Sequence, residues 1–336
     1  MPKVTIDTIE IEVPEGTTIL QAARMIGERD AAHRHVVPPT MCYYSKLKTS
    51  GGYCRTCIVK VTKGSDKDPR PMPKPVASCR TAVMDGMVVE NTTNPELLDA
   101  RKGVTEFLLI NHPLDCPICD QAGECHLQDL GYEHGLSKSR YAFERRTFEP
   151  IDIGDTIKLH MNRCILCYRC VKVAEQLTDG RVHGVINRGD VAEISTYIQE
   201  AVDNDFSGNM IDVCPVGALT DRTFRFASRV WYTKPMDAHR KCPTCSGRAV
   251  LWMKGNEVLR VTGRKDQWGE VEEFICNACR FDHKDVKHWT VEGPRQVDRH
   301  SVIGANHYEL QLKQKLLTKA APDSTPVGRP QELPGA

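Results

Sequence analysis

The sequence predicts an α+β chain of several small domains that are organised around cysteine-rich loops. At 336 residues the chain is long enough for two or three domains. Segments with the period of short strands and segments with the period of helices both occur along it. Fifteen cysteines are an odd number, and in the reducing compartment expected for this chain they are poor candidates for disulfides. Metal ligation is the better explanation for them.

The composition argues against several kinds of partner. Lys and Arg (45) nearly balance Asp and Glu (44), so no net field draws the chain to nucleic acid or to an acidic membrane surface. The longest apolar runs fall far short of the roughly 20 residues that span a bilayer. The amino terminus lacks the pattern of a signal peptide. We therefore expect no membrane span and a cytosolic location.

We predict a first domain over residues 1–82. Apolar residues alternate over 4–6 and again, one residue out of phase, over 9–13, which predicts two strands joined by a tight turn. Thr18 and Gln21 have the spacing of a capping box, and apolar residues follow them at helical spacing. A helix is therefore expected to cross the hairpin.

Loops of this domain carry the first predicted site, which consists of Cys42-x11-Cys54-x2-Cys57-x21-Cys79. Plant-type two-iron centres use C-x4-C-x2-C and a distant fourth cysteine, and only the first gap is longer here. Gly51 and Gly52 would let the backbone pass close to the cluster and direct amide N–H groups at its sulfides. Four cysteines at this spacing could also bind zinc, but the preceding hairpin and helix favour a 2Fe-2S centre.

A second domain is expected over residues 83–150. An amphipathic helix over 95–111 would deliver a histidine to a group of three cysteines, in the pattern His112-x3-Cys116-x2-Cys119-x5-Cys125. By spacing, the fifteen cysteines fall into groups of four, three, four and four, so the histidine completes a fourth set of four ligands. The set is expected to hold a 4Fe-4S cluster whose potential the imidazole raises. A structural zinc site is the alternative.

A ferredoxin-like four-iron domain is predicted over residues 151–228. Its ligands are Cys164-x2-Cys167-x2-Cys170 with the distant Cys214. A short C-x2-C-x2-C turn can place three thiolates on three corners of one cubane while the fourth comes from elsewhere. This spacing predicts a second 4Fe-4S cluster. We expect another short helix directly after Cys214 and Pro215.

A fourth, β-rich module is predicted over residues 229–290 and a carboxy-terminal tail over 291–336, which is polar and proline-rich beyond about 310 and is expected to be flexible. Its two knuckles are Cys242-x2-Cys245 and Cys276-x2-Cys279. Paired C-x2-C knuckles are typical of zinc ribbons, although the gap between them is usually shorter. From spacing alone zinc and iron are nearly equally supported.

Four motifs carry a resemblance to a known family. The stretches "PTMCYYSKLKTSGGYCRTCIVKV", "INHPLDCPICDQAGECHLQD", "NRCILCYRCVKV" and "DVCPVGALTDR" resemble signatures of the peripheral-arm iron-sulfur subunit family of respiratory NADH:quinone oxidoreductase (complex I). The resemblance covers residues 1 to about 230 closely. It implies a β-grasp fold for the first domain and the three cluster sites given above.

Two departures from the family concern the carboxy-terminal part. Many members bind an off-path cubane through C-x2-C-x3-C and one distant cysteine, whereas here Ala249 stands at the third position and Cys279 is additional. The fourth site is thus rebuilt as paired knuckles, for which zinc is slightly favoured over a further 4Fe-4S cluster. Larger members continue into a domain that resembles molybdopterin oxidoreductases, so the chain looks like a short form.

The resemblance implies an electron-transfer subunit on the cytoplasmic face of the inner membrane. Electrons would come from a flavin- and NADH-binding partner and pass through this chain toward quinone. Other peripheral-arm subunits of complex I would be its further partners. No G-x-G-x-x-G or G-x4-G-K-[ST] motif occurs, so no hydride-transfer site or catalytic residue is expected here. Alternatives are the diaphorase subunit of an NAD-linked hydrogenase or formate dehydrogenase and, in another class, a zinc-stabilised structural or redox-sensor protein.

Three arginines lie beside predicted ligands in the sequence, namely Arg55, Arg163 and Arg169. A positive charge next to a cluster stabilises its reduced, more negative state. Arginines on the protein surface are the more frequent explanation for such positions.

Overall fold

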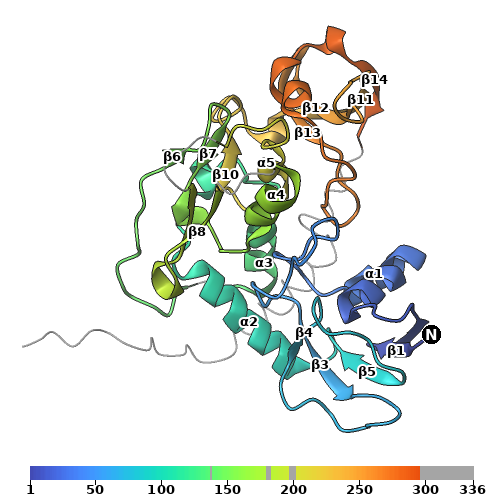
Figure 1. The fold of residues 1–336 in the computed structure, drawn as a ribbon. Coiled ribbons are helices and arrows are strands. Elements are labelled where there is room, and N and C mark those ends of the chain that lie inside the picture. Colours follow the sequence, from blue (N-terminus) through green and yellow to red (C-terminus); the bar gives the residue numbers. More distant parts are fainter. Residues whose placement is uncertain (137, 179–182, 197–201, 296–336) are drawn as a thin grey trace, which may run out of the picture.

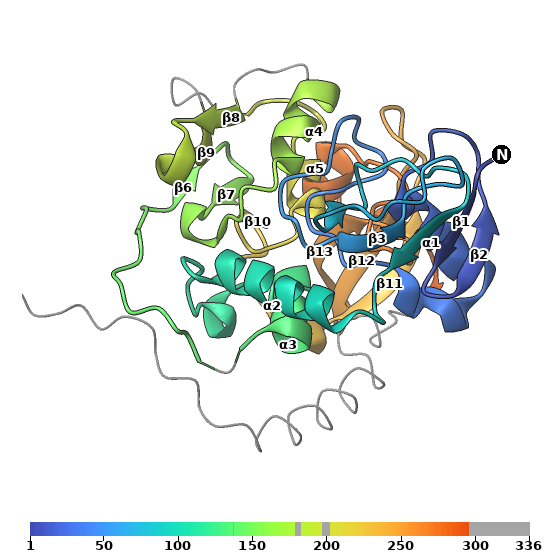
Figure 2. The same cartoon turned by 90° about the horizontal axis from the view of Figure 1, so that it is seen from below.

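The computed structural model describes residues 1–136, 138–178, 183–196 and 202–295. The described residues form four sheets, and the loops and helices outside their strands carry the cysteines (Figure 1). The fourth sheet lies at one end of the molecule and the amino-terminal sheet at the other. Helices α2 (Pro95–Leu109) and α3 (His126–His134) lie side by side (Figure 2).

The amino-terminal domain is a five-stranded sheet with one helix packed on it. Its strand order is β2-β1-β5-β3-β4, in which β1 and β5 are parallel and the other neighbours are antiparallel. Helix α1 (Ile19–Arg29) buries its apolar face in the same core as the strands, which is a β-grasp arrangement. The strands are β1 (Lys3–Ile6), β2 (Ile9–Glu12), β3 (Ile58–Lys63), β4 (Val76–Ala77) and β5 (Met87–Glu90).

Local sequence rules explain how this domain begins. Asp7 and Thr8 form the two-residue turn between β1 and β2 and have positive φ angles of 45° and 82°. Thr18 caps α1 by accepting from the Gln21 N–H at 3.3 Å, and the Gln21 side chain accepts from the Thr18 N–H at 2.9 Å. The predicted hairpin and capping box are confirmed. The sheet extends beyond the expected boundary at residue 82, because β5 is its central strand.

The middle of the chain contains two helical pairs and a small sheet. Helices α2 and α3 contact each other, and α4 contacts α5. A three-stranded antiparallel sheet has the order β10-β7-β6, and β8 pairs with β9 in a hairpin. The elements are α2 (Pro95–Leu109), α3 (His126–His134), β6 (Ile151–Asp152), β7 (Ile157–Leu159), α4 (Arg169–Leu177), β8 (His183–Ile186), β9 (Glu193–Thr196), α5 (Asn209–Val213) and β10 (Leu219–Asp221).

The prediction of a short helix after Cys214 and Pro215 is wrong. Helix α5 ends just before Cys214, and a turn over residues 215–218 leads into β10 instead. Leu219 of β10 pairs with Leu159 of β7, so tertiary strand pairing decides the conformation of this apolar stretch.

The fourth module is an antiparallel sheet of order β13-β12-β11-β14. Strand β14 extends past residue 290, where the tail was expected to begin, and the rest of that tail lies outside the described residues. The strands are β11 (Lys234–His239), β12 (Arg248–Lys254), β13 (Glu257–Gly263) and β14 (Thr290–Pro294). Within the described ranges, no helix is long and apolar enough to cross a bilayer.

Several short helical turns hold predicted ligands or their neighbours. The short turns along the described chain are η1 (Ala31–Val36), η2 (Cys116–Ile118), η3 (Met161–Arg163), η4 (Gly189–Val191), η6 (Val230–Tyr232), the π-helical η7 (Ala278–Asp282) and η8 (Val286–His288).

Candidate iron-sulfur and metal sites

The first predicted set is gathered in loops around the end of the amino-terminal sheet. All four sulfurs are in buried residues, and the backbone N–H groups of Tyr53 and Cys54 donate to the Cys42 sulfur at 3.3 and 3.4 Å. Hydrogen bonds from Cys54 and then Cys79 lower the pKa of Cys42 to about 2. The same sulfur–sulfur hydrogen bonds raise the pKa of Cys54 and Cys79, so the thiolate is favoured at Cys42 in particular, where the two N–H groups also donate.

Gly51 is required where this loop passes the fourth ligand. Its φ is +96°, and a Cβ added there would lie 3.1 Å from the Cys79 sulfur. The close approach expected of the glycine pair is therefore present at Gly51. The N–H donors to sulfur, however, come from the two residues after the glycines.

In the second set, α2 ends at Leu109 and the backbone N–H of His112 donates to the Leu109 carbonyl at 3.0 Å. Burial, followed by the positive charge of Arg163, lowers the pKa of His112 to about 4. Its Nδ1 atom is buried and has no hydrogen-bond partner among the described residues. A neutral imidazole with a buried, unused nitrogen fits a metal ligand.

The cysteines of this set differ in their exposure. Cys116 is exposed, whereas Cys119 and Cys125 are buried. Burial raises the pKa of Cys119 and raises that of Cys125 to about 12. Buried sulfurs with such pKa values are poorly stabilised as bare thiolates, so a cationic iron group would compensate them.

The third set lines a cavity that is otherwise apolar. The cavity is bounded by Ile165, Tyr168, Ile194, Val216, Ala218 and Leu219 together with Cys164, Cys167, Cys170 and Cys214. Leu166 and Tyr168, which stand on either side of Cys167, have positive φ angles of 52° and 64°. These left-handed residues wrap the turn around the cavity, and the Leu166 N–H donates to the Cys164 sulfur at 3.3 Å. Four thiols around one enclosed space fit a cubane.

Arg169 joins the first set to the third. Its guanidinium donates to the carbonyl of Tyr43, next to Cys42, at 2.6 Å and to the carbonyl of Val213, next to Cys214, at 3.3 Å. The ring of Tyr53 also stacks on that of Tyr168, with centroids 4.5 Å apart. The ligand loops of these two sets are therefore in direct contact.

Arg163 joins the third set to the second. It precedes Cys164 and forms an ion pair of 2.8 Å with Asp115, which precedes Cys116. Gly217 faces Cys119 so closely that a larger residue would clash with its sulfur. In space the sets thus follow the order first, third, second, which differs from their order in the sequence.

The arginines divide into two kinds. Arg163 and Arg169 are only 3% exposed, so the surface explanation is wrong for both. Arg55 is exposed, as a surface arginine would be. The bridging roles of Asp115 and of the Tyr53–Tyr168 stack were missed from the sequence, where the only signal was their position beside ligands.

The fourth set is the most compact. The sulfurs of Cys242, Cys245, Cys276 and Cys279 all lie within 4.8 Å of one another. Cys242 and Cys245 stand in the loop between β11 and β12, and Cys279 is in η7. Backbone N–H groups of Thr244 and Gly247 donate to the first two sulfurs at 3.4 Å each.

These folds and cysteine sets define an iron-sulfur protein built from a 2Fe-2S domain and 4Fe-4S domains. Three family models match, described as a 2Fe-2S iron-sulfur cluster binding domain (residues 2–94), the NADH-ubiquinone oxidoreductase-G iron-sulfur binding region (101–140) and the ferredoxin-like domain of NADH-quinone oxidoreductase subunit 3 (154–220). The chain thus carries the iron-sulfur domains of the NADH-quinone oxidoreductase-G family.

Curated relatives agree with this family. The chain is 39% identical over 88% of its length to the NADH-ubiquinone oxidoreductase 75 kDa subunit of Reclinomonas americana, of which it covers 40%. It is 37% identical over 87% of its length to the mitochondrial NADH dehydrogenase [ubiquinone] iron-sulfur protein 1 of Solanum tuberosum, of which it covers 37%. The chain therefore spans about two fifths of the length of these relatives.

Among solved structures, a chain of an NAD+-reducing [NiFe]-hydrogenase in the H2-reduced state is similar. The two align with a TM-score of 0.56 and 25% sequence identity, over 68% of this chain and 91% of the hydrogenase chain. A fold over about two thirds of this chain is thus shared with that hydrogenase chain.

Proposed function

We propose that this chain is an electron-transfer subunit of an NADH:quinone oxidoreductase. In this proposal Cys42, Cys54, Cys57 and Cys79 hold a 2Fe-2S cluster. His112, Cys116, Cys119 and Cys125 hold one 4Fe-4S cluster, and Cys164, Cys167, Cys170 and Cys214 hold another. When bound, such clusters supply one-electron transfer. For the fourth set, zinc or a further 4Fe-4S cluster leaves the path through the other three unchanged.

The observation that carries the proposal is the continuous contact between the ligand loops of the three sets. Arg169 spans the first and third sets, and the Arg163–Asp115 pair spans the third and second. Electron carriers must be held close together at fixed separation, and buried hydrogen-bonded charges are well suited to hold them. A protein in which the cysteines only stabilised separate small domains would have no need of such bridges.

The bridging arginines also affect the reduction potentials of the neighbouring clusters. A buried positive charge favours the reduced form of a neighbouring cluster, because reduction adds one negative charge. In the first set, N–H donors to the Cys42 sulfur act in the same direction. We infer that these groups help to set the cluster potentials.

Partners are expected on both sides of this relay. Electrons would be supplied by a flavin- and NADH-binding subunit and would leave toward quinone through other peripheral-arm subunits, on the cytoplasmic face of the inner membrane. Exposed apolar side chains support such a packed position: Leu114 and Ile118 flank the exposed Cys116, and Phe226 and Tyr232 line an open pocket with Ile118. Patches of this kind are typical of protein interfaces.

A second candidate is the iron-sulfur subunit of the diaphorase part of an NAD-linked hydrogenase. It is favoured by the fold shared with the NAD+-reducing hydrogenase chain. Both candidates predict the same clusters and the same spatial order. Quinone reduction by the assembled complex, as opposed to reduction of NAD+ by hydrogen, distinguishes them.

The proposal can be tested on anaerobically purified protein with its clusters in place. One two-iron cluster and two cubanes require about 10 iron and about 10 sulfide per chain. Cys57→Ser should remove about 2 of these iron atoms and abolish only the two-iron EPR signal, whereas Cys170→Ser should remove about 4 and spare that signal. A colourless chain with about four zinc ions would overturn the proposal.

A further inference from the structure

The fourth cysteine set has sulfur separations that are characteristic of a single ion. The Cys242 and Cys276 sulfurs lie 3.7 Å apart, and so do those of Cys245 and Cys279. No other group of metal-ligand atoms in the described part of the chain is as compact, although three other cysteine-rich sets lie within it. The fourth set therefore differs in kind from the three sets assigned to clusters.

A tetrahedral zinc site reproduces these separations. With a zinc–sulfur distance of roughly 2.3 Å, the edge of a regular tetrahedron of sulfurs is about 3.8 Å. A cubane instead places its four thiolates outside four different corners of the cluster, so the sulfurs must be farther apart. The residues present thus fit one ion and do not fit the cubane that many family members bind in this region.

The surroundings of the set also fit zinc. Four thiolates and one Zn²⁺ carry a net charge of −2, which must be compensated. The Arg240 guanidinium donates to the Cys279 sulfur at 3.5 Å, and the Thr244 and Gly247 N–H groups add two further donors. Gly247 has a φ of +68° and faces the Arg240 carbonyl too closely for a side chain, so it is needed to form its knuckle.

We propose that Cys242, Cys245, Cys276 and Cys279 bind one zinc ion that carries no electrons and holds residues 265–275, the docking segment, against the two-iron domain. Zinc has no redox chemistry in proteins and contributes directly to folding at structural sites. The assignment is independent of the proposed relay, because it concerns a separate set of ligands.

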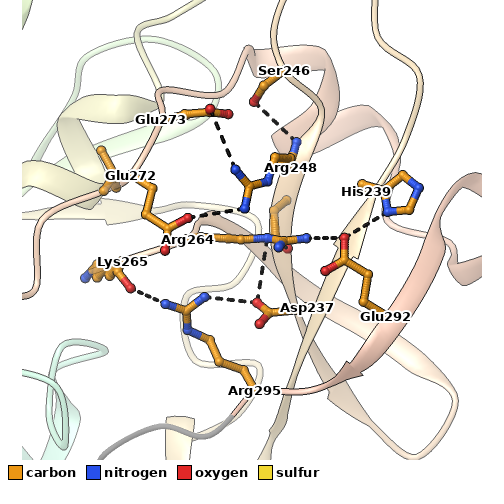
Figure 3. Close-up of polar contacts among 12 residues, drawn as sticks. Asp237, His239, Ser246, Arg248, Arg264, Lys265, Glu272, Glu273, Glu292 and Arg295 are labelled. Atoms are coloured by element: carbon orange, nitrogen blue, oxygen red, sulfur yellow. Dashed lines mark hydrogen bonds and ion pairs between the residues drawn. The ribbon is translucent and has the colours of Figure 1, made fainter. Parts of the chain in front are cut away.

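The docking segment begins at an ion network on the fourth sheet (Figure 3). Arg264, at the end of this sheet, donates to the Ala238 carbonyl at 2.8 Å and pairs with Glu292 at 2.7 Å. Arg295 pairs with Asp237 at 3.0 Å and also donates to the Lys265 carbonyl. These contacts fix the first residue of the segment to β11 and β14.

The other end of the segment is fixed by the metal ligands. Cys276 directly follows residue 275, and Cys279 is followed by Arg280. Arg280 forms a buried ion pair of 2.6 Å with Asp212, two residues before the cluster ligand Cys214. The zinc site thus anchors the end of the docking segment beside the third set.

Between these anchors the docking segment contacts the two-iron domain. Glu270, whose side chain is 2% exposed, pairs with Arg24 at 2.7 Å and accepts from the Ser45 N–H at 2.7 Å. The Val271 N–H donates to the Tyr44 hydroxyl at 2.6 Å. Tyr44 and Ser45 follow the first-set ligand Cys42 closely, so the segment touches the loop that holds the two-iron cluster.

The test compares the cluster-loaded full chain with two variants. In Cys242→Ser, zinc should fall from one per chain to none while iron stays at about 10. Amide hydrogen exchange over residues 265–275 should become at least about tenfold faster, because one anchor is lost. The matched variant Glu270→Gln should keep its zinc but also show faster exchange over 265–275.

Two results would overturn the proposal. Loss of about 4 iron in place of zinc in Cys242→Ser would identify a cubane. Loss of zinc with unchanged exchange over 265–275 would remove the docking role. If Cys242→Ser does not fold, zinc X-ray absorption on the unmodified chain should show four sulfur neighbours at about 2.3 Å; their absence would overturn the assignment. Failure of the relay would appear separately, in the iron and sulfide content.

Discussion

Substitution of Arg280 by Met tests how strongly the fourth module is joined to the four-iron domain. The Arg280 and Asp212 side chains are 1% and 3% exposed, and their closest atoms are 2.6 Å apart. Although burial alone would raise the pKa of Asp212, the charge and hydrogen bonds of Arg280 hold it below its usual value. Met fills much of the space but leaves the carboxylate buried and unpaired, which costs about 3–5 kcal/mol.

The Gly263 amide reports this loss locally, because its N–H donates to the Asp212 carboxylate at 2.9 Å. If opening of this contact limits exchange, Arg280→Met should accelerate exchange at Gly263 and its neighbours by about a hundredfold to a few thousandfold, since 1.4 kcal/mol is a factor of ten. The double variant Arg280→Met with Asp212→Asn should recover part of the protection by removing the unpaired charge. An acceleration below tenfold, or a double variant as fast as the single one, would refute the reasoning.

Three further substitutions give defined outcomes. His112→Cys adds a negative charge to its cluster and should lower that cluster's potential in an EPR-monitored titration without moving the two-iron potential. Arg169→Gln should lower the potentials of the first and third sets, whereas the exposed control Arg55→Gln should leave both unchanged. Burial and then the charge of Glu133 raise the pKa of Asp129 to about 7. The fold therefore favours the protonated carboxyl, and folding stability falls as the pH rises toward 7. Asp129→Asn should remove this loss, so it should raise Tm at pH 8 and less so at pH 6. A Tm gain that does not shrink at lower pH would contradict this.

Features governed by neighbouring residues could be predicted from the sequence. The capping box at Thr18 and Gln21 depends on residues three apart, and the first hairpin depends on alternation over ten residues, so both were anticipated. The grouping of cysteines with His112 followed from short spacings in the same way. Such features need no knowledge of the tertiary fold.

Features governed by distant contacts could not be predicted. Arg169 reaches the Tyr43 carbonyl across 126 positions, so no local pattern indicated that the third set lies between the other two. The stretch after Cys214 has too few residues for its period to separate helix from strand, and its pairing with β7 decided the outcome. The place of β5 in the first sheet, past residue 82, was missed for a similar reason, because β5 pairs in parallel with a strand about 80 positions earlier.

The enclosure of the third set constrains how the protein is made. Three of its four cysteines are buried, and the residues after Cys214 close both its cavity and, through Gly217, the space beside Cys119. A preassembled cubane could not enter the finished fold without opening it. The third set would therefore have to receive its cluster before the residues after Cys214 have folded over it, whereas the first set has all its ligands once Cys79 has emerged and the second once Cys125 has emerged.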